Sequence, residues 1–458
     1  MKKFVLYILT ILLLNLPQLS AQQFGKGIIL TESSPDYVQV SSNLMRGDYL
    51  NLPQKFSLKR FTPTPGNQGA FSTCAGWACS YSARTILNSI KNNYIQPLID
   101  ENAFSPSFVY NQIRKDSSCN NPVILHEALD IIKTQGVLQI KDFGYECERQ
   151  IKSQEKYKAG VNKILEYREI FNRYSSSKIT STKKSISEFK PVIIAMDVPG
   201  SFERVGNIWD PPPSDYKVWG LGHALVVIGY DDSLSGGAFE VINSWGTEWG
   251  NNGYCWIRYK DFDYFTFSGY EIIDDISNAD ADYGLTGTLT FVLENGEPIE
   301  LKKDESIFQT VSSYSSGTKF RVLLSNNEPA FIYAFGSDLK KKITPIFPPN
   351  KKISPLLPYK NNNIALPNDY SSLMLDETTG KTYFCFIYSS KKIDIENAFK
   401  KINKNKGTFE QRVNKYFLQD LANDSEIFLK DSNKIELRAK SEGKKLVVLI
   451  VEIGHKGG

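Results

Sequence analysis

The sequence predicts an α+β protein in which a helical segment is followed by antiparallel strands and then by a second, β-rich domain. Three observations lead to this class. The chain has 458 residues, which is too long for one ordinary core and favours two domains. The hydrophobic patterns are mostly helical up to Gly136 and change to strands after about Lys190. A further change follows Tyr270, where acidic and small residues indicate a linker.

The composition excludes several classes of protein. A hydrophobic fraction of 41%, with 12% aromatic residues, is typical of a globular chain and argues against wholesale disorder. The formal charge of +4 is small for this length, so we expect no nucleic-acid partner. The acidic residues of the linker do not have the spacing of an EF-hand loop. We therefore expect neither a metal ion nor a cofactor.

The first 21 residues have the three parts of a secretory signal peptide. Lys2 and Lys3 precede an apolar run, and small residues lead to Ala21. The alternative is a membrane anchor, but the apolar run is shorter than the ~20 residues of a spanning helix, and no later segment is long enough. We expect a cleaved signal, no transmembrane anchor and an exported protein, periplasmic or secreted. A short polar leader, 22–55, would follow.

The next domain is expected over 56–272. Three helices should come first, at about 74–92, from 105 onward and at about 124–134. Ser72 and Thr73 are good N-cap residues for the first helix, and Gly136 is a fitting C-cap for the third. Strands should follow at 191–196, 223–230, 238–242 and 254–259.

The linker is expected over 273–284, and a β-rich accessory domain over 285–458. Short alternating patterns predict strands at 288–293, 319–324, 330–335 and 446–453. Asn295-Gly296 is a hairpin signal. Two charged helical stretches are expected at about 393–403 and 408–421. This domain shows no catalytic constellation, and its partner is not predictable.

Cys74 is the candidate nucleophile. In the first turn of a helix, unpaired N–H groups and the helix dipole favour a thiolate. Six positions earlier, Gln68 carries an amide that can donate a hydrogen bond to a developing oxyanion. Cys79 is the nearby rival, but it lies a turn deeper in the helix and too far from Gln68.

The candidate bases are the three histidines, His126, His223 and His455. The last lies in a Gly/Lys-rich tail and is expected at the surface, while the first fits a partly buried structural role in a helix. The second follows Gly222 and opens an apolar strand. Alone, it would be read as a satisfied core histidine.

The residues around Asn243 change that interpretation. An asparagine side chain can accept a hydrogen bond from the ring N–H of His223 and fix its tautomer. Trp245 can shield this bond from water, which strengthens it. The alternative is a Gly/Trp-rich turn that serves packing only.

Taken together, these motifs resemble the papain family of cysteine peptidases over about 56–270. The matching segments are Asn67-Gln68-Gly69, Cys74, Gly222-His223-Ala224, Gly229-Tyr230, and Asn243-Ser244-Trp245-Gly246 running on to Tyr254. The resemblance implies a papain-like two-lobed fold, with a helical lobe, a lobe of antiparallel strands and a substrate groove between them. It also implies protein or peptide substrates.

The resemblance assigns a role to each site residue. Cys74 would be the nucleophile and His223 its general base and acid. Asn243 would orient His223, Trp245 would shield their contact, and Gln68 with the backbone N–H of Cys74 would form the oxyanion hole. A thiolate beside a cationic imidazole would lower the cysteine pKa to roughly 4.

The sequence also departs from the best-known members of the family. Ala75-Gly76 stand between Cys74 and Trp77, which is more similar to a bacterial branch. Phe71 occupies the place of the usual half-cystine, and 22–54 is too short for the usual helical propeptide. How activity is held in check is therefore unexplained.

The cysteines and the overall activity leave alternatives open. Cys119 and Cys147 flank one predicted helix in polar contexts and are the best disulfide pair. Three others are expected to be buried thiols, namely Cys79, Cys255 and Cys385. The leading hypothesis is an exported cysteine endopeptidase. The alternatives are a catalytically silent papain-like binding protein and a transamidase that uses the same acyl-thioester.

Overall fold

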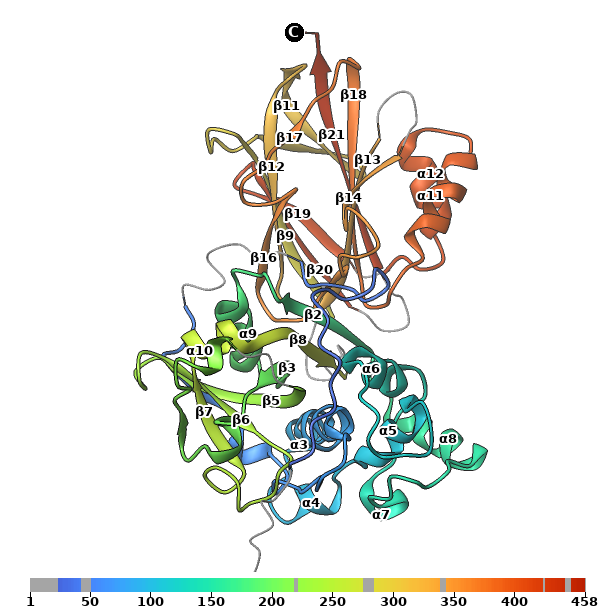
Figure 1. The fold of residues 1–458 in the computed structure, drawn as a ribbon. Helices are drawn as coiled ribbons and strands as arrows, with labels where there is room; N and C mark the ends of the chain where they lie inside the picture. Colours follow the sequence, from blue (N-terminus) through green and yellow to red (C-terminus); the bar gives the residue numbers. More distant parts are fainter. Residues whose placement is uncertain are drawn as a thin grey trace, which may run out of the picture.

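The computed structural model describes residues 24–42, 51–217, 221–274, 284–337, 343–422, 425–440 and 446–457. Two bodies lie end to end, the first formed by the chain up to β8 and the second by the chain from β9 onward (Figure 1). The expected signal peptide and nearly all of the expected linker lie outside the described residues.

One sheet of eight strands forms half of the first body. The strand order is β2-β8-β3-β5-β6-β7-β4, with β1 joined to β5. The pairs from β2 through β7 are antiparallel, as the α+β prediction requires. The bounds are β1 (Lys55–Ser57), β2 (Glu166–Asn172), β3 (Val192–Val198), β4 (Ile208–Trp209), β5 (Leu221–Asp231), β6 (Ala238–Ile242), β7 (Tyr254–Arg258) and β8 (Thr266–Ile273).

A group of helices forms the other half, and α9 and α10 lie with the sheet (Figure 1). The α-helices are α2 (Cys74–Gly76), α3 (Thr85–Asn92), α4 (Leu98–Glu101), α5 (Pro106–Ile113), α6 (Leu125–Thr134), α7 (Ile140–Phe143), α8 (Ser153–Ala159), α9 (Lys178–Ser187) and α10 (Tyr259–Phe265). Four 3-10 turns complete the body, namely η1 (Lys59–Phe61), η3 (Gly160–Asn162), η4 (Phe202–Arg204) and η5 (Asp215–Lys217). One buried apolar cluster contains residues from both halves, so the two lobes share a core.

The helix that begins at Cys74 is continuous to Asn92, because a π-helical stretch, η2 (Trp77–Arg84), joins α2 to α3. Thr73 is the N-cap residue, but its side chain does not cap the helix. Its hydroxyl instead forms a 2.9 Å hydrogen bond with the hydroxyl of Tyr145. The predicted helix start is correct, while the predicted side-chain cap is wrong because a tertiary partner takes the hydroxyl.

The second body is a sandwich of two sheets, in agreement with the predicted β-rich accessory domain. One sheet has the order β10-β11-β21-β18-β13-β14 with β15 on β13, and the other β16-β12-β9-β20-β19 with β17 on β12. The bounds are β9 (Leu285–Leu293), β10 (Leu301–Asp304), β11 (Ile307–Ser315), β12 (Lys319–Asn326), β13 (Ala330–Ser337), β14 (Ile343–Phe347), β15 (Leu356–Leu357), β16 (Asn362–Leu366), β17 (Leu373–Met374), β18 (Gly380–Ser389), β19 (Ser425–Lys430), β20 (Lys434–Ala439) and β21 (Leu446–Lys456).

Both faces of the β13-β18-β21 sheet are buried. Apolar residues of one face pack against the second sheet, as Phe386 does against Phe291. The other face is covered by α11 (Ile395–Lys404) and α12 (Phe409–Phe417), which contribute Ile402 and Val413 to a separate apolar cluster. The two charged helical stretches were therefore predicted correctly, within a few residues.

His455 is buried, and its expected surface position is wrong. It is 4% exposed because β21 continues to Lys456, beyond the predicted end of the last strand. Its two ring nitrogens lie 3.0 Å from the hydroxyl of Ser316 and 3.3 Å from that of Thr382. The Gly/Lys-rich sequence did not indicate that the last predicted strand continues to Lys456.

The two bodies meet at a buried polar cluster. Arg168 on β2 forms an ion pair with Glu271 on β8, and both side chains are at most 2% exposed. Tyr359 of the accessory domain donates its hydroxyl to the same carboxylate, and Arg168 donates to the carbonyl of Leu356 at 3.1 Å.

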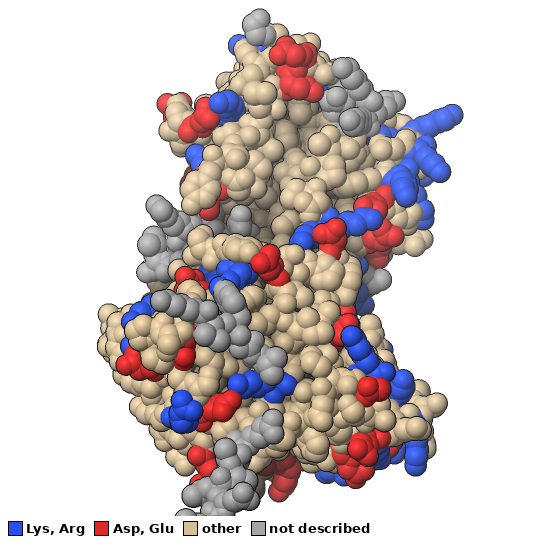
Figure 2. Space-filling view, in the orientation of Figure 1, with Lys and Arg blue, Asp and Glu red and all other residues tan. Residues whose placement is uncertain are grey.

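Over the molecular surface seen in Figure 2, positive and negative side chains are interspersed without a broad face of one sign.

Candidate active site

Cys74 and Gln68 are both buried at the start of the helical lobe. Cys74 is the first residue of α2, and both side chains have an exposed fraction of 0%. The loop before the helix is fixed to the sheet, because the Gln68 N–H donates to the Ser244 carbonyl at 2.8 Å. The Ser244 hydroxyl in turn donates to Gln68 Oε1 at 2.5 Å. The segments that carry Gln68 and Asn243 are thus joined directly.

His223 lies on β5 and is oriented by Asn243. His223 Nε2 is 2.8 Å from Asn243 Oδ1, and the Ser244 N–H donates to the same oxygen at 2.7 Å. Because that oxygen only accepts, Nε2 carries the proton and Nδ1 keeps a free lone pair. Nδ1 is buried without a hydrogen-bond partner among the described residues. The ring is therefore held in the tautomer of a general base.

Trp245 covers this pair. Its indole stacks on the His223 ring with centroids 4.6 Å apart and planes 27° apart, and it is 1% exposed. The shielding position predicted for Trp245 is where the structure places it. The backbone of Ala224, the residue after His223, lies close enough to the Cys74 thiol to lower its pKa. Nucleophile and base therefore adjoin across the boundary between the two lobes.

Residues 24–30, here called the covering segment, lie over this site. Their backbone bonds to both lobes: the Gly25 N–H donates to Gly69 O at 3.0 Å, and the Ile28 N–H to Gly222 O at 2.9 Å. The Gly27 carbonyl accepts from the Val123 N–H at 2.9 Å. In Figure 1 this blue stretch descends from the junction of the two bodies and passes in front of α3. The sequence predicted only a polar leader here.

The carbonyl of Gly25 accepts a hydrogen bond from Gln68, one of the two donors expected to form the oxyanion hole. Gln68 Nε2 donates to Gly25 O at 3.0 Å, and Trp245 Nε1 donates to the same oxygen at 3.1 Å. Gln68 Nε2 also donates to Phe71 O at 2.6 Å. Phe24 stacks on the outer face of Trp245 with centroids 4.6 Å apart. A peptide carbonyl is thus bound between the side chains of Gln68 and Trp245.

Two glycines allow this close approach. A Cβ on Gly25 would lie 2.0 Å from Phe71 O, and one on Gly27 would lie 2.4 Å from Ser72 O. Both distances are far shorter than a van der Waals contact, and the backbone oxygens cannot move aside as a flexible side chain could. Any other residue at these positions would lift the covering segment from the helical lobe.

Burial controls the protonation of the site in this form. It raises the pKa of Cys74 to about 11, although backbone N–H groups of Ala224 and Gly27 partly offset the rise. Burial lowers the pKa of His223 to about 4, with a further lowering by the nearby charge of Lys26, while the hydrogen bond that His223 donates to Asn243 acts in the opposite direction. The expected thiolate–imidazolium pair, with a cysteine pKa of roughly 4, is therefore wrong for the covered site. Without water, the neutral pair is more stable.

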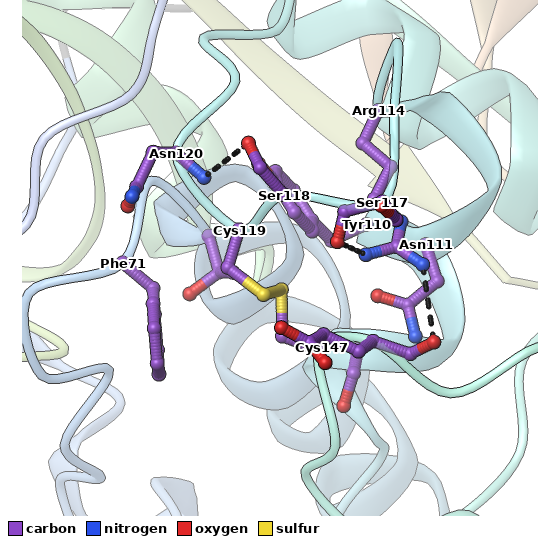
Figure 3. Close-up of a disulfide and its surroundings, with 12 residues drawn as sticks. Phe71, Tyr110, Asn111, Arg114, Ser117, Ser118, Cys119, Asn120 and Cys147 are labelled. Carbon is purple, nitrogen blue, oxygen red and sulfur yellow. Dashed lines mark hydrogen bonds between the residues drawn. A yellow bond between two sulfur atoms is a disulfide. The ribbon is translucent and has the colours of Figure 1, made fainter.

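A disulfide supports the loop that precedes Cys74. Cys119 is bonded to Cys147, the pair favoured by the sequence, and the Ser72 N–H donates to Cys119 O at 2.7 Å. Figure 3 shows Phe71 beside this disulfide, in the loop that leads to α2. The other four cysteines are free and buried, which agrees with the expectation for Cys79, Cys255 and Cys385.

Neither a metal site nor a membrane span emerges from the parts of the chain that the structure describes. No group of three or more His, Cys, Asp or Glu side chains is placed to hold an ion there. None of the helices in these ranges has both the length and the apolar character needed to cross a membrane.

Residues 79–267 match the family model described as papain family cysteine protease. This part of the chain is therefore similar to the papain family of cysteine proteases. With the helical lobe and the antiparallel sheet, the match identifies a papain-like fold over roughly half of the chain. The matched range contains His223, Asn243 and Trp245, and it begins after Gln68 and Cys74.

Relatives of known name agree with the protease domain. The chain is 25% identical over 242 residues to the viral cathepsin of Rachiplusia ou multiple nucleopolyhedrovirus, covering 53% of this chain and 65% of that protein. It is 26% identical over 196 residues to cysteine proteinase COT44 of Brassica napus, covering 41% and 53%. The chain thus spans less than two thirds of the curated relatives it matches.

Among solved structures, the cysteine protease xylellain from Xylella fastidiosa aligns with a TM-score of 0.47 at 21% identity. The alignment covers 55% of this chain and 97% of that one.

Proposed function

We propose that this protein is an exported cysteine endopeptidase in which Cys74 is the nucleophile and His223 the general base and acid. The observation that carries the proposal is the arrangement of His223. Asn243 fixes its tautomer, and the ring nitrogen left without a partner is buried at the boundary where Cys74 begins its helix. Such an unpaired buried acceptor costs stability, and a catalytic role is a reason for a protein to retain it.

The proposed reaction hydrolyses a peptide bond in two stages. His223 Nδ1 takes the thiol proton, and the Cys74 sulfur attacks the substrate carbonyl carbon. Gln68 Nε2 and a backbone N–H stabilise the oxyanion. His223 then gives the proton to the leaving amine as the C–N bond breaks. A water molecule, deprotonated by His223, attacks the thioester and releases the acid and the free thiol.

The covered site is inactive in this proposal, because the Gly25 carbonyl fills the place of the substrate oxygen and burial keeps the thiol protonated. The test therefore compares the chain from Gln22 with a shortened chain that begins at Thr31. An epoxide-type thiol reagent should label Cys74 in the shortened chain and only slowly in the longer one, as read by peptide mass spectrometry.

Variants and products distinguish the alternatives. Cys74→Ala should abolish labelling at this position and hydrolysis of peptides, whereas Cys79→Ala should keep both. If the shortened chain is labelled but cleaves no peptide, the silent binding protein becomes the better hypothesis. If added amines are incorporated into products instead of water, the protein is a transamidase. Sequencing the N-terminus of the exported protein tests cleavage after Ala21.

A further inference from the structure

We propose that the accessory domain keeps the peptidase latent by holding the N-terminal leader in place, so that undocking this domain uncovers the active site. The contacts that carry the inference are made by residues 34–41, here called the clasp. The clasp follows the covering segment along the chain and lies between the two domains. The inference rests on the proposed peptidase function.

On one side, the clasp extends the peptidase sheet. The Ser41 N–H donates to Glu169 O at 2.9 Å, and the Glu169 N–H donates to Gln39 O at 2.9 Å, so that the clasp pairs with β2 in parallel. β2 is the edge strand of its sheet. The Ser34 hydroxyl adds bonds to the buried Glu169 carboxylate at 3.0 Å and to the Tyr270 hydroxyl at 2.6 Å.

On the other side, the same residues pair with the accessory domain. The Val40 N–H donates to Lys352 O at 2.7 Å, and the Ser354 N–H donates to Val40 O at 2.9 Å. Val40 therefore bonds only to the accessory domain, while its neighbours Gln39 and Ser41 bond to β2. The clasp therefore lies between β2 and the accessory domain, and its backbone N–H and C=O groups need both neighbours as hydrogen-bond partners.

Side chains of the accessory domain hold the clasp from outside. Lys352 Nζ is 3.4 Å from Ser34 O and 3.5 Å from the Asp36 carboxylate. Lys392 Nζ is 2.9 Å from Gln39 Oε1 and 3.0 Å from the Glu166 carboxylate on β2. Lys392 thus bridges the leader and the peptidase domain.

The clasp restrains the covering segment by chain length alone. Only residues 31–33 separate the two, so Leu30 can move at most about 14 Å from Ser34 even when the connection is fully extended. A tethered segment that leaves the site rebinds at a high effective concentration. While the clasp is held, the covering segment therefore competes with a substrate for the site at this high effective concentration.

The docking of the accessory domain has its own anchor, which does not involve the leader. Tyr359 donates to the buried Glu271 carboxylate and lies 2.9 Å from the Ser185 hydroxyl. Removing the Tyr359 side chain leaves Arg168 bonded to Glu271 and to the Leu356 carbonyl, but takes away both contacts of the Tyr359 hydroxyl. This gives a second, independent way to loosen the same device.

The test measures how fast iodoacetamide labels Cys74 in the chain from Gln22 at neutral pH, followed by peptide mass spectrometry, with hydrolysis of a peptide substrate read in parallel. In K352E/K392E, the reversed charges would repel the Asp36 and Glu166 carboxylates that the two lysines now face. We expect labelling about tenfold faster than in the unchanged chain. Tyr359→Ala should show a rise in the same direction.

The matched control is K319E/K430E, which reverses two lysines of the same domain that pair only with accessory-domain carboxylates, at 3.4 and 3.5 Å. It should label at the unchanged rate. Gly25→Val serves as the positive control, because the added side chain meets Phe71 O and expels the covering segment directly. Thermal unfolding of each variant verifies that the domains remain folded.

The outcomes separate this inference from the proposed function. If Gly25→Val accelerates labelling and hydrolysis while K352E/K392E and Tyr359→Ala do not, the accessory domain does not control the covering segment and the peptidase proposal stands. If K352E/K392E and Tyr359→Ala accelerate labelling but no variant hydrolyses peptides, the inferred role of the accessory domain stands and the peptidase proposal falls. Equal acceleration in K319E/K430E would also overturn the inference.

Discussion

Each domain contains a buried histidine on a β-strand, and the two are held in opposite ways. In the accessory domain, both ring nitrogens of His455 face hydroxyl groups, from Ser316 and Thr382. In the peptidase domain, His223 has one partner, Asn243, and its second nitrogen has no partner among the described residues. A buried polar atom without a partner costs about 1–3 kcal/mol. Under the proposed function, the first histidine stabilises its domain and the second is kept available for chemistry.

The largest effect should come from His223→Ala in the chain that begins at Thr31. Without the base, we expect hydrolysis of a peptide substrate to slow about 10³-fold or more, since proton transfer to and from the leaving group is lost. Steady-state kinetics measure the change, and His455→Ala is the control with unchanged turnover. Comparable activity in the two variants would remove the distinction between the histidines.

Acid should favour the uncovered form. The pKa of His223 is about 4 under the covering segment and returns towards its ordinary value of 6.5 when water reaches the ring. The uncovered form therefore binds a proton more readily, so the stability of the covered form is lost as the pH falls from 6.5 through 4. We expect the uncovered population to rise on the order of tenfold or more between neutral pH and pH 4.5.

Hydrogen exchange of the covering segment, corrected for the intrinsic pH dependence, measures this population. In His223→Asn the acid effect should disappear, because the titrating ring is gone. An acid effect that persists in this variant would assign the titration to another group.

The smallest effect should come from His455→Ala. Two hydroxyl groups lose their partner, and we expect the free energy of unfolding of the accessory domain to fall by about 1–2 kcal/mol. Urea unfolding followed by near-ultraviolet circular dichroism measures it. Thr382→Val, which removes one of the two contacts and keeps the side-chain shape, should cost less. A larger loss from the single contact would contradict the balanced arrangement.

The sequence predicted the apolar strands and the motif residues well, because their signals are local. β3, β5, β6 and β7 follow continuous apolar runs, and α5 starts where Ser105 and Pro106 indicate a helix, with the Ser105 hydroxyl accepting from the Phe108 N–H. The prediction missed β2. This strand contains Glu166, Arg168 and Glu169, charged residues that are buried only because partners from other elements compensate them.

The position of the covering segment could not be predicted from the sequence, for a related reason. Its contacts are mainly backbone hydrogen bonds to residues far along the chain, such as Gly222 and Val123, and such bonds leave no pattern in side-chain types. The two glycines of Gly25-Lys26-Gly27 were the available signal. The same loss of context explains the error for Cys74, whose thiolate was predicted from the helix start without the burial that now opposes it.

The position of the clasp also sets an order of assembly. Gln39 bonds to Lys351 across 312 residues of sequence, and Lys352 reaches Ser34 across 318. As the chain is made from its N-terminus, the leader emerges first, yet its docking partners in the accessory domain emerge near the end. Contacts of such large sequence separation form late, because the loop-closure entropy must be overcome first. If both proposals hold, the newly made protein completes its catalytic residues before it completes its own restraint.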